Sequence, residues 1–158
     1  MQFRSAIDFK DYALWGALAA ALLLPCIASA TLGEPEASVQ TDAAQLNGSI
    51  QMTDRAIYRV HEIQMPSGTS LREYVSSDGN VFAVAWNGPS MPNLRQALGR
   101  FFDPYVAALQ ARHGDRNHVQ IQLDNLVVQV SGHMRGPFAG RAYLPQAVPA
   151  GVSVGDLH

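Results

Sequence analysis

Hydrophobic and polar residues alternate along several short stretches of the chain after about residue 57. This period of two, in runs rich in Val, Ile, Tyr and Phe, is typical of β-strands with one buried face. Turn-forming Gly, Pro, Ser and Asp residues separate the runs. We therefore expect strands at residues 57–65, 69–75, 81–87, 119–123, 126–130 and 138–144.

Between the third and fourth of these strands the hydrophobic period changes to three and four residues. Leu94, Leu98, Phe101, Tyr105 and Leu109 form one helical stripe, which predicts a helix packed on the sheet. Asp and Pro at 103–104 suit a helix start, so we expect either two short helices or one helix kinked there, ending near residues 113–114. The fold class is α+β: an antiparallel sheet of about five to six strands in βββαβββ order, with a kinked helix on one face and an irregular tail after residue 145.

The turn sequences also predict which residues face each other across the strands. A two-residue loop at 78–79 places Val75 opposite Phe82, Glu73 opposite Val84 and Leu71 opposite Trp86. If the preceding loop at 66–68 has three residues, Arg59 and His61 share the face of Glu73. The sequence then predicts a polar cluster of Arg59, His61 and Glu73 among apolar side chains.

The hairpin at 119–130 has a register of its own. A two-residue turn at 124–125 pairs Ile121 with Val128 and Gln120 with Gln129. One face is then apolar and the other is polar, as in an antiparallel sheet that is covered on one side.

The N-terminal 30 residues have the composition of an export signal. A polar stretch at 1–12 precedes an apolar run at 13–24, which is too short to span a bilayer comfortably. Pro25 follows, and the small residues Ala28, Ser29 and Ala30 form an A-x-A site. We expect a Sec-type signal peptide at 1–30 with cleavage after Ala30, a flexible leader at 31–55 and a single domain at 56–158. The mature protein would be periplasmic or secreted, with no stable membrane span.

Composition restricts the chemistry of the mature chain. The protein has 47% hydrophobic and 15% charged residues and a net charge of -2, which gives no electrostatic case for nucleic-acid binding. Cleavage would remove the sole lysine, Lys10, and the sole cysteine, Cys26. Disulfides, thiolate metal sites and Schiff bases are then excluded. Acylation of Cys26 is the alternative, which Pro25 disfavours because that position normally holds a small residue.

Motifs that would identify a reaction are absent from the sequence. The histidines lack H-x-x-x-H and H-E-x-x-H spacing, and no serine lies in a G-x-S-x-G context. P-loop and dinucleotide fingerprints are missing as well. We expect neither a metal nor a cofactor.

Three groups of residues are candidate sites. Trp86, Pro89, Met91 and Pro92 combine an aromatic ring with a stiff loop that could dock a partner, unless Trp86 belongs to the core. His133 and Arg135 lie among glycines and could hold an anion, or form an exposed turn. Arg59, His61 and Glu73 could supply a base, a proton shuttle and an orienting cation, or a structural ion pair.

Several strings together resemble a known family. They run from Ser67-Gly68-Thr69 through Arg72-Glu73-Tyr74-Val75 and the segment 81–86 to Gly88-Pro89, Met91-Pro92 and Leu98-Gly99, with Gly132-His133-Met134 and the segment 142–146 later. This pattern is similar to the DUF2844 family of exported proteobacterial proteins. The resemblance implies export and a shared fold, and it implies no catalytic residues.

These observations favour an exported envelope protein that is a non-enzymatic binding or accessory module for an unknown protein or envelope component. The alternative is a small hydrolase or lyase that uses Glu73 and His61, or His133. An enzyme requires a concave site in which a carboxylate and an imidazole come within hydrogen-bond reach. A third possibility is a structural protein anchored by an uncleaved signal.

Overall fold

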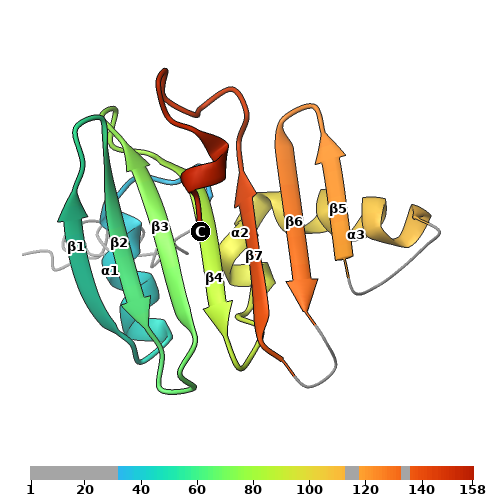
Figure 1. Cartoon of the computed structure of the whole chain (residues 1–158), viewed down its shortest axis with the longest axis horizontal. Helices are drawn as coiled ribbons and strands as arrows, with labels where there is room; N and C mark the ends of the chain where they lie inside the picture. Colours follow the sequence, from blue (N-terminus) through green and yellow to red (C-terminus); the bar gives the residue numbers. More distant parts are fainter. Residues whose placement is uncertain (1–31, 113–117, 133–135) are drawn as a thin grey trace, which may run out of the picture.

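Seven antiparallel strands form one sheet in the computed structural model, which describes residues 32–112, 118–132 and 136–158 (Figure 1). The order in the sheet is β1-β2-β3-β4-β7-β6-β5. The strands are β1 (Ser49–Asp54), β2 (Tyr58–Gln64), β3 (Ser70–Ser76), β4 (Val81–Gly88), β5 (His118–Leu123), β6 (Leu126–Gly132) and β7 (Phe138–Tyr143). The helical segments are α1 (Ala37–Gln45), α2 (Leu94–Leu98), η1 (Gly99–Phe101), α3 (Phe102–Ala111) and η2 (Val154–Asp156).

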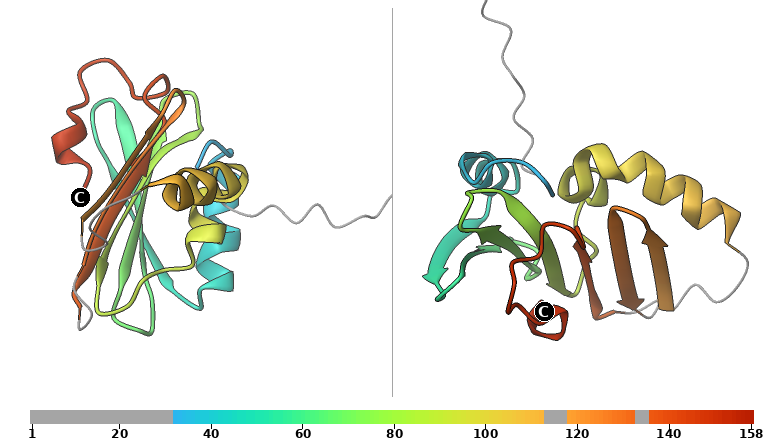
Figure 2. Two further views of the ribbon diagram at one scale, coloured as in Figure 1. Left: turned by 90° about the vertical axis from the view of Figure 1, so that its right-hand side faces the viewer. Right: turned by 90° about the horizontal axis from the view of Figure 1, so that it is seen from above.

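The connections follow from the strand order. β1 to β4 form a meander of neighbouring strands, and α2, η1 and α3 then carry the chain behind the sheet to its far edge (Figure 2). From that edge β5, β6 and β7 return toward the centre, where β7 pairs with β4. The sheet therefore consists of two antiparallel meanders, β1 to β4 and β5 to β7, which are joined by the pairing of β4 with β7.

The main core lies between the sheet and the helices. Alternate strand residues such as Val84, Val128 and Ala142 point to this face and have no solvent exposure. Val39 of α1 and Leu98 of α2 pack on them from the helical layer. Burial of this apolar surface is the main source of stability, as in other two-layer domains.

A second, smaller core lies on the opposite face of the sheet. The C-terminal segment, residues 144–158, runs in front of β4 in Figure 1. Leu157 of this segment packs with Tyr74 and Phe82, and all three are buried. Tyr58 meets the edge of the Phe82 ring, with centroids 6.1 Å apart. The segment leaves β6 and β5 uncovered on this face, so one end of the sheet stays open.

The predicted flexible leader is wrong for the described part of residues 31–55. Leu32, Val39 and Ala43 are buried, and residues 49–54 form β1 at the sheet edge. Backbone bonds fix the entry to α1, with the Gly33 N–H donating to Val81 O at 2.7 Å. The sheet consequently has seven strands where five to six were expected, and a helix precedes the first strand.

Most of the predicted registers are confirmed. Glu73 faces Val84 and Leu71 faces Trp86, and in the later hairpin Ile121 faces Val128 and Gln120 faces Gln129.

The pairing of Val75 with Phe82 is wrong, because Val75 pairs with Val81 across an irregularity in the ladder. The Ser76 N–H donates to Asn80 O, so the loop has three residues, and Gly79 adopts a φ of 78° that favours glycine. One extra residue is then accommodated in β4.

The predicted helix is interrupted, but five residues earlier than expected. The break falls at Gly99, whose φ is 46°, where η1 separates α2 from α3. Pro104 lies within the first turn of α3, where a missing N–H costs no helical hydrogen bond. The helix therefore accommodates Pro104 without a kink at that position, and the glycine supplies the change of direction.

Candidate functional site

The loop around Trp86 does not form the expected aromatic surface. The Trp86 side chain is only 3% exposed and packs in the helix-side core. It lies against Gly140, the residue paired with it on β7. Pro92 is also buried, so only Pro89 and Met91 of the predicted docking residues are exposed. His133 and Arg135 lie outside the described residues.

The residues of the predicted polar cluster lie on the helix-covered face of β2 and β3. His61 pairs with Glu73 and Arg59 with Val75, which confirms that Arg59, His61 and Glu73 share one face. Glu36, just before α1, completes the cluster. Its carboxylate contacts Arg59 Nη2 and His61 Nε2, each at 2.8 Å. Glu36 was not among the expected site residues, because it lies in the segment that was predicted to be a flexible leader.

Glu73 is the most deeply buried charged residue of this cluster, with no solvent exposure. Neither of its carboxylate oxygens accepts a hydrogen bond from an N–H or hydroxyl group in the described part of the chain. Its polar neighbour is the Asp42 carboxyl of α1. Burial first, and the neighbouring Asp42 carboxyl second, raise the pKa of Glu73 well above 4.5.

Asp42 is also held by the neighbouring helix α2. Gln96 of α2 donates from Nε2 to Asp42 Oδ1 at 2.9 Å. Two neighbouring buried carboxyl groups repel each other when both are charged, so the pair favours a proton on one of them. Together with Gln96, the two carboxyl groups connect α1, α2 and β3.

Burial limits what this cluster can do chemically. Asp42 and Glu73 have no exposure and His61 has 5%, whereas an acid or base must reach its substrate directly or through one water. Within the described ranges, no three His, Cys, Asp or Glu side chains are arranged to hold a metal ion. The geometry fits an internal polar link between helices and sheet better than a catalytic centre.

A cavity of about 540 Å³ lies elsewhere, at the open end of the sheet. Gln129 and Arg141 of its lining alternate along their strands with the core residues Val128 and Ala142, so they belong to the face opposite the helices. This volume is within the range of small-molecule sites. The lining residues are Trp86, Asn87, Arg112, His118, Val119, Gln120, Gln129, Val130, Ser131, Ala139, Gly140, Arg141, Leu157 and His158.

Arg141 of β7 is held firmly at the boundary between this cavity and the C-terminal segment. Its Nε donates to Gln129 Oε1 at 2.7 Å, and its Nη1 donates to Val154 O at 2.6 Å and to Leu157 O at 3.3 Å. Side chain and segment therefore fix each other, and the guanidinium has a defined position in the cavity.

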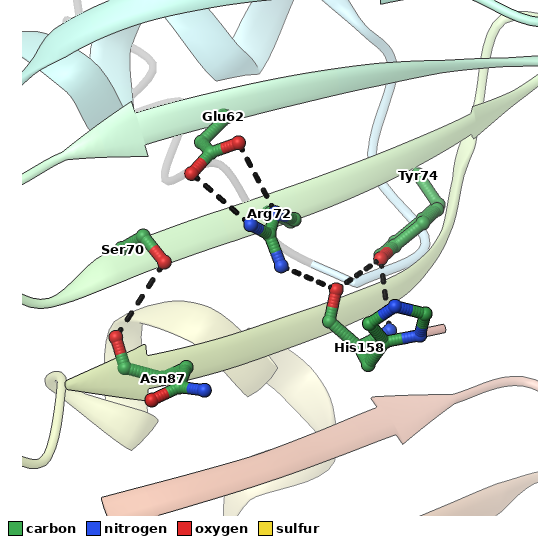
Figure 3. A network of polar contacts seen from close by, with 6 residues as sticks. All are labelled: Glu62, Ser70, Arg72, Tyr74, Asn87 and His158. Atoms are coloured by element: carbon green, nitrogen blue, oxygen red, sulfur yellow. Dashed lines mark hydrogen bonds and ion pairs between the residues drawn. The ribbon is translucent and has the colours of Figure 1, made fainter. Parts of the chain in front are cut away.

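The end of the C-terminal segment is attached through a second arginine (Figure 3). Arg72 Nη1 donates to His158 O at 2.5 Å, while the same guanidinium pairs with the Glu62 carboxylate at 3.1 and 3.3 Å. The Tyr74 hydroxyl donates to His158 O and accepts from His158 N–H. These contacts hold Leu157 and His158 beside the cavity that they line.

The family described as "Protein of unknown function (DUF2844)" matches residues 28–157. Searches of curated proteins and of solved structures gave no match.

Proposed function

Because the chain belongs to the DUF2844 family, whose description assigns no activity, we propose a function from the geometry: an exported, non-enzymatic envelope module that binds a polar ligand in the cavity of β4, β7, β6 and β5. The ligand would be an envelope component or a polar group of a partner protein. We prefer this cavity to the loop at 86–92 as the binding site, because the aromatic side chain of that loop, Trp86, is buried.

One observation carries the proposal. The cavity and the buried acids lie on opposite faces of the sheet, and among the residues that the structure describes no Asp or Glu lines the cavity. A hydrolase or lyase that uses Glu73 and His61 needs these groups in a concave site. The accessible site offers amides, imidazoles, a hydroxyl and guanidinium groups, which suit recognition by hydrogen bonds.

Export is proposed from the sequence of the first 30 residues. The family match begins at residue 28, so it leaves most of that stretch outside. In the part of the chain that the structure describes, no helix has the length and apolarity to cross a membrane. Intact-mass analysis of the protein from its native host tests cleavage after Ala30; a mass that includes residues 1–30 would contradict it.

Binding in the cavity can be tested by filling it. Ser131 lines the cavity on β6, and a Ser131→Tyr variant would occupy its space without adding charge. Gln122 lies on neighbouring β5 and is exposed, but is not a lining residue, so Gln122→Tyr is the matched control. Immobilised variants are incubated with envelope extract, and the retained material is identified by mass spectrometry.

Wild type and Gln122→Tyr should retain the same component, which Ser131→Tyr should lose while its unfolding midpoint stays unchanged. A Met91→Ala variant reports on the alternative surface. Equal retention by Ser131→Tyr, or a loss confined to Met91→Ala, would reject the cavity as the binding site.

A further inference from the structure

We propose that the ligand of this cavity carries an oxyanion, a carboxylate or a phosphate, and that Arg141 binds it together with the amides of Gln120 and Gln129. This inference rests on the cavity being the binding site, and it adds the chemical class of the ligand.

The Arg141 guanidinium is fixed in position and still has donors to spare. A guanidinium has five N–H donors, and those on Nε and Nη1 are used by Gln129, Val154 and Leu157. Nη2 has no acceptor among the described residues, although the group lines the cavity. Its position is therefore set in advance, while two strong donors remain for a ligand.

The positive charge of Arg141 is not balanced by a carboxylate among the described residues. Two other partly buried arginines, Arg59 and Arg72, pair with Glu36 and Glu62. Arg141 is also half-buried, but no carboxylate contacts it in the described ranges. A partly desolvated cation gains from a bound anion, and hydrogen bonds between guanidinium and oxyanion are among the stronger kinds. Arg112 adds a second positive group to the lining.

Two amide side chains beside Arg141 can bind the rest of the ligand. Gln129 Oε1 accepts from Arg141, so the two N–H donors of that amide point away from the guanidinium. Gln120 is the cross-strand neighbour of Gln129 and is exposed. Amides beside a fixed cation suit a ligand with hydroxyl groups near its anionic group. Acidic sugars and sugar phosphates share this chemistry.

The test uses three matched probes on the full chain at constant ionic strength: galacturonic acid, galactose 6-phosphate and neutral galactose. Amide signals of Gln120, Gln129 and Arg141 are followed by NMR in ¹⁵N-labelled protein. We expect saturable shifts with at least one acidic probe and none with galactose. The probe with the higher affinity distinguishes a carboxylate ligand from a phosphate ligand.

Variants of Gln120 test the role of charge without removing the contacts of Arg141. Gln120→Glu should weaken binding of the acidic probe by about fivefold, and Gln120→Lys should strengthen it by about as much. Gln51→Glu, on β1 at the opposite edge of the sheet, is the control and should leave the affinity unchanged. Arg141→Lys should abolish saturable binding, provided that its spectrum remains that of the folded protein.

Three results would overturn the proposal: no shift at these residues with either acidic probe, equal shifts with galactose, or the same affinity in Gln120→Glu as in wild type. Equal binding of galactose would leave the proposed binding function intact and reject only the anionic class. Failure of the binding function itself is read separately, from the retention experiment with Ser131→Tyr.

Discussion

The carboxyl groups of Asp42 on α1 and Glu73 on β3 are neighbours in the core, and neither residue has any solvent exposure. Two buried carboxylates side by side repel each other, which favours a proton on one of them. Burial first, and Asp42 second, raise the pKa of Glu73 well above 4.5. Folding therefore favours the protonated form of Glu73, and this has consequences for stability.

Glu73→Gln should stabilise the protein at neutral and alkaline pH. The folded state binds the Glu73 proton more tightly than the unfolded state, so the wild-type free energy of unfolding should fall as pH rises above 4.5 through the raised pKa. Glutamine keeps the donor and carries no charge, so its advantage should grow across this range. Urea unfolding at several pH values measures the difference.

The control for this experiment is Asp124→Asn, an exposed acid in the turn between β5 and β6. Its unfolding curves should follow wild type at every pH. A Glu73→Gln variant whose difference from wild type is independent of pH would contradict the raised pKa of Glu73.

Val39→Ala should destabilise the protein by about 2 kcal/mol, because it leaves a cavity in the core under α1. Val39 is 1% exposed. The exposed neighbour Gln40 provides the comparison, and Gln40→Ala should change the free energy of unfolding by less than about 0.5 kcal/mol. Equal stability of the Val39→Ala variant and wild type would mean that residues 32–46 do not contribute to the core.

Gly140→Ala should displace Trp86. A methyl group at residue 140 would overlap the Trp86 ring and lie 2.7 Å from Gln129 O. We expect this overpacking to lower the free energy of unfolding by about 1–3 kcal/mol and to shift the tryptophan fluorescence emission. Gly155→Ala, whose methyl group would meet only the Ser153 hydroxyl at 3.3 Å, should leave both unchanged. If Gly140→Ala kept the wild-type emission and stability, the Trp86 ring would not pack this closely on residue 140.

Leu157→Ala should loosen the C-terminal segment. Leu157 is fully buried against the aromatic residues of the second core, and its truncation should cost about 2–4 kcal/mol. Hydrogen exchange should accelerate at Leu144, whose N–H donates to Phe82 O at the start of the segment. If the Leu144 N–H of the Leu157→Ala variant exchanged at the wild-type rate, the second core would not be what holds this segment in place. Asp156→Ala, at an exposed neighbour, serves as the reference.

Local pattern accounts for much of the fold and for part of each site. Alternation located β2, β3, β4, β5, β6 and β7, because a strand with one buried face must repeat every two residues. Turn length then placed His61 opposite Glu73 and Gln120 opposite Gln129. The buried polar cluster and the polar face that lines the cavity could therefore be predicted in part from the sequence.

The segment before β2 was not predicted, because its helix carries little periodic signal. α1 is built mainly from Ala, Ser, Thr and Gln residues, and its few buried positions become apolar contacts only when the sheet lies beneath them. Glu36 and Asp42 reach His61 and Glu73 from this helix region. No short-range pattern could have located these two acids.

By itself, the sequence determined which residues share a face within each hairpin, because strand period and turn length are local properties. The tertiary structure alone decided that β7 pairs with β4, that α1 brings Asp42 to Glu73, and that the C-terminal carbonyls position Arg141. These relationships join segments far apart in the chain. They depend on how whole surfaces pack, and this packing has no signature in the neighbouring residues of any one segment.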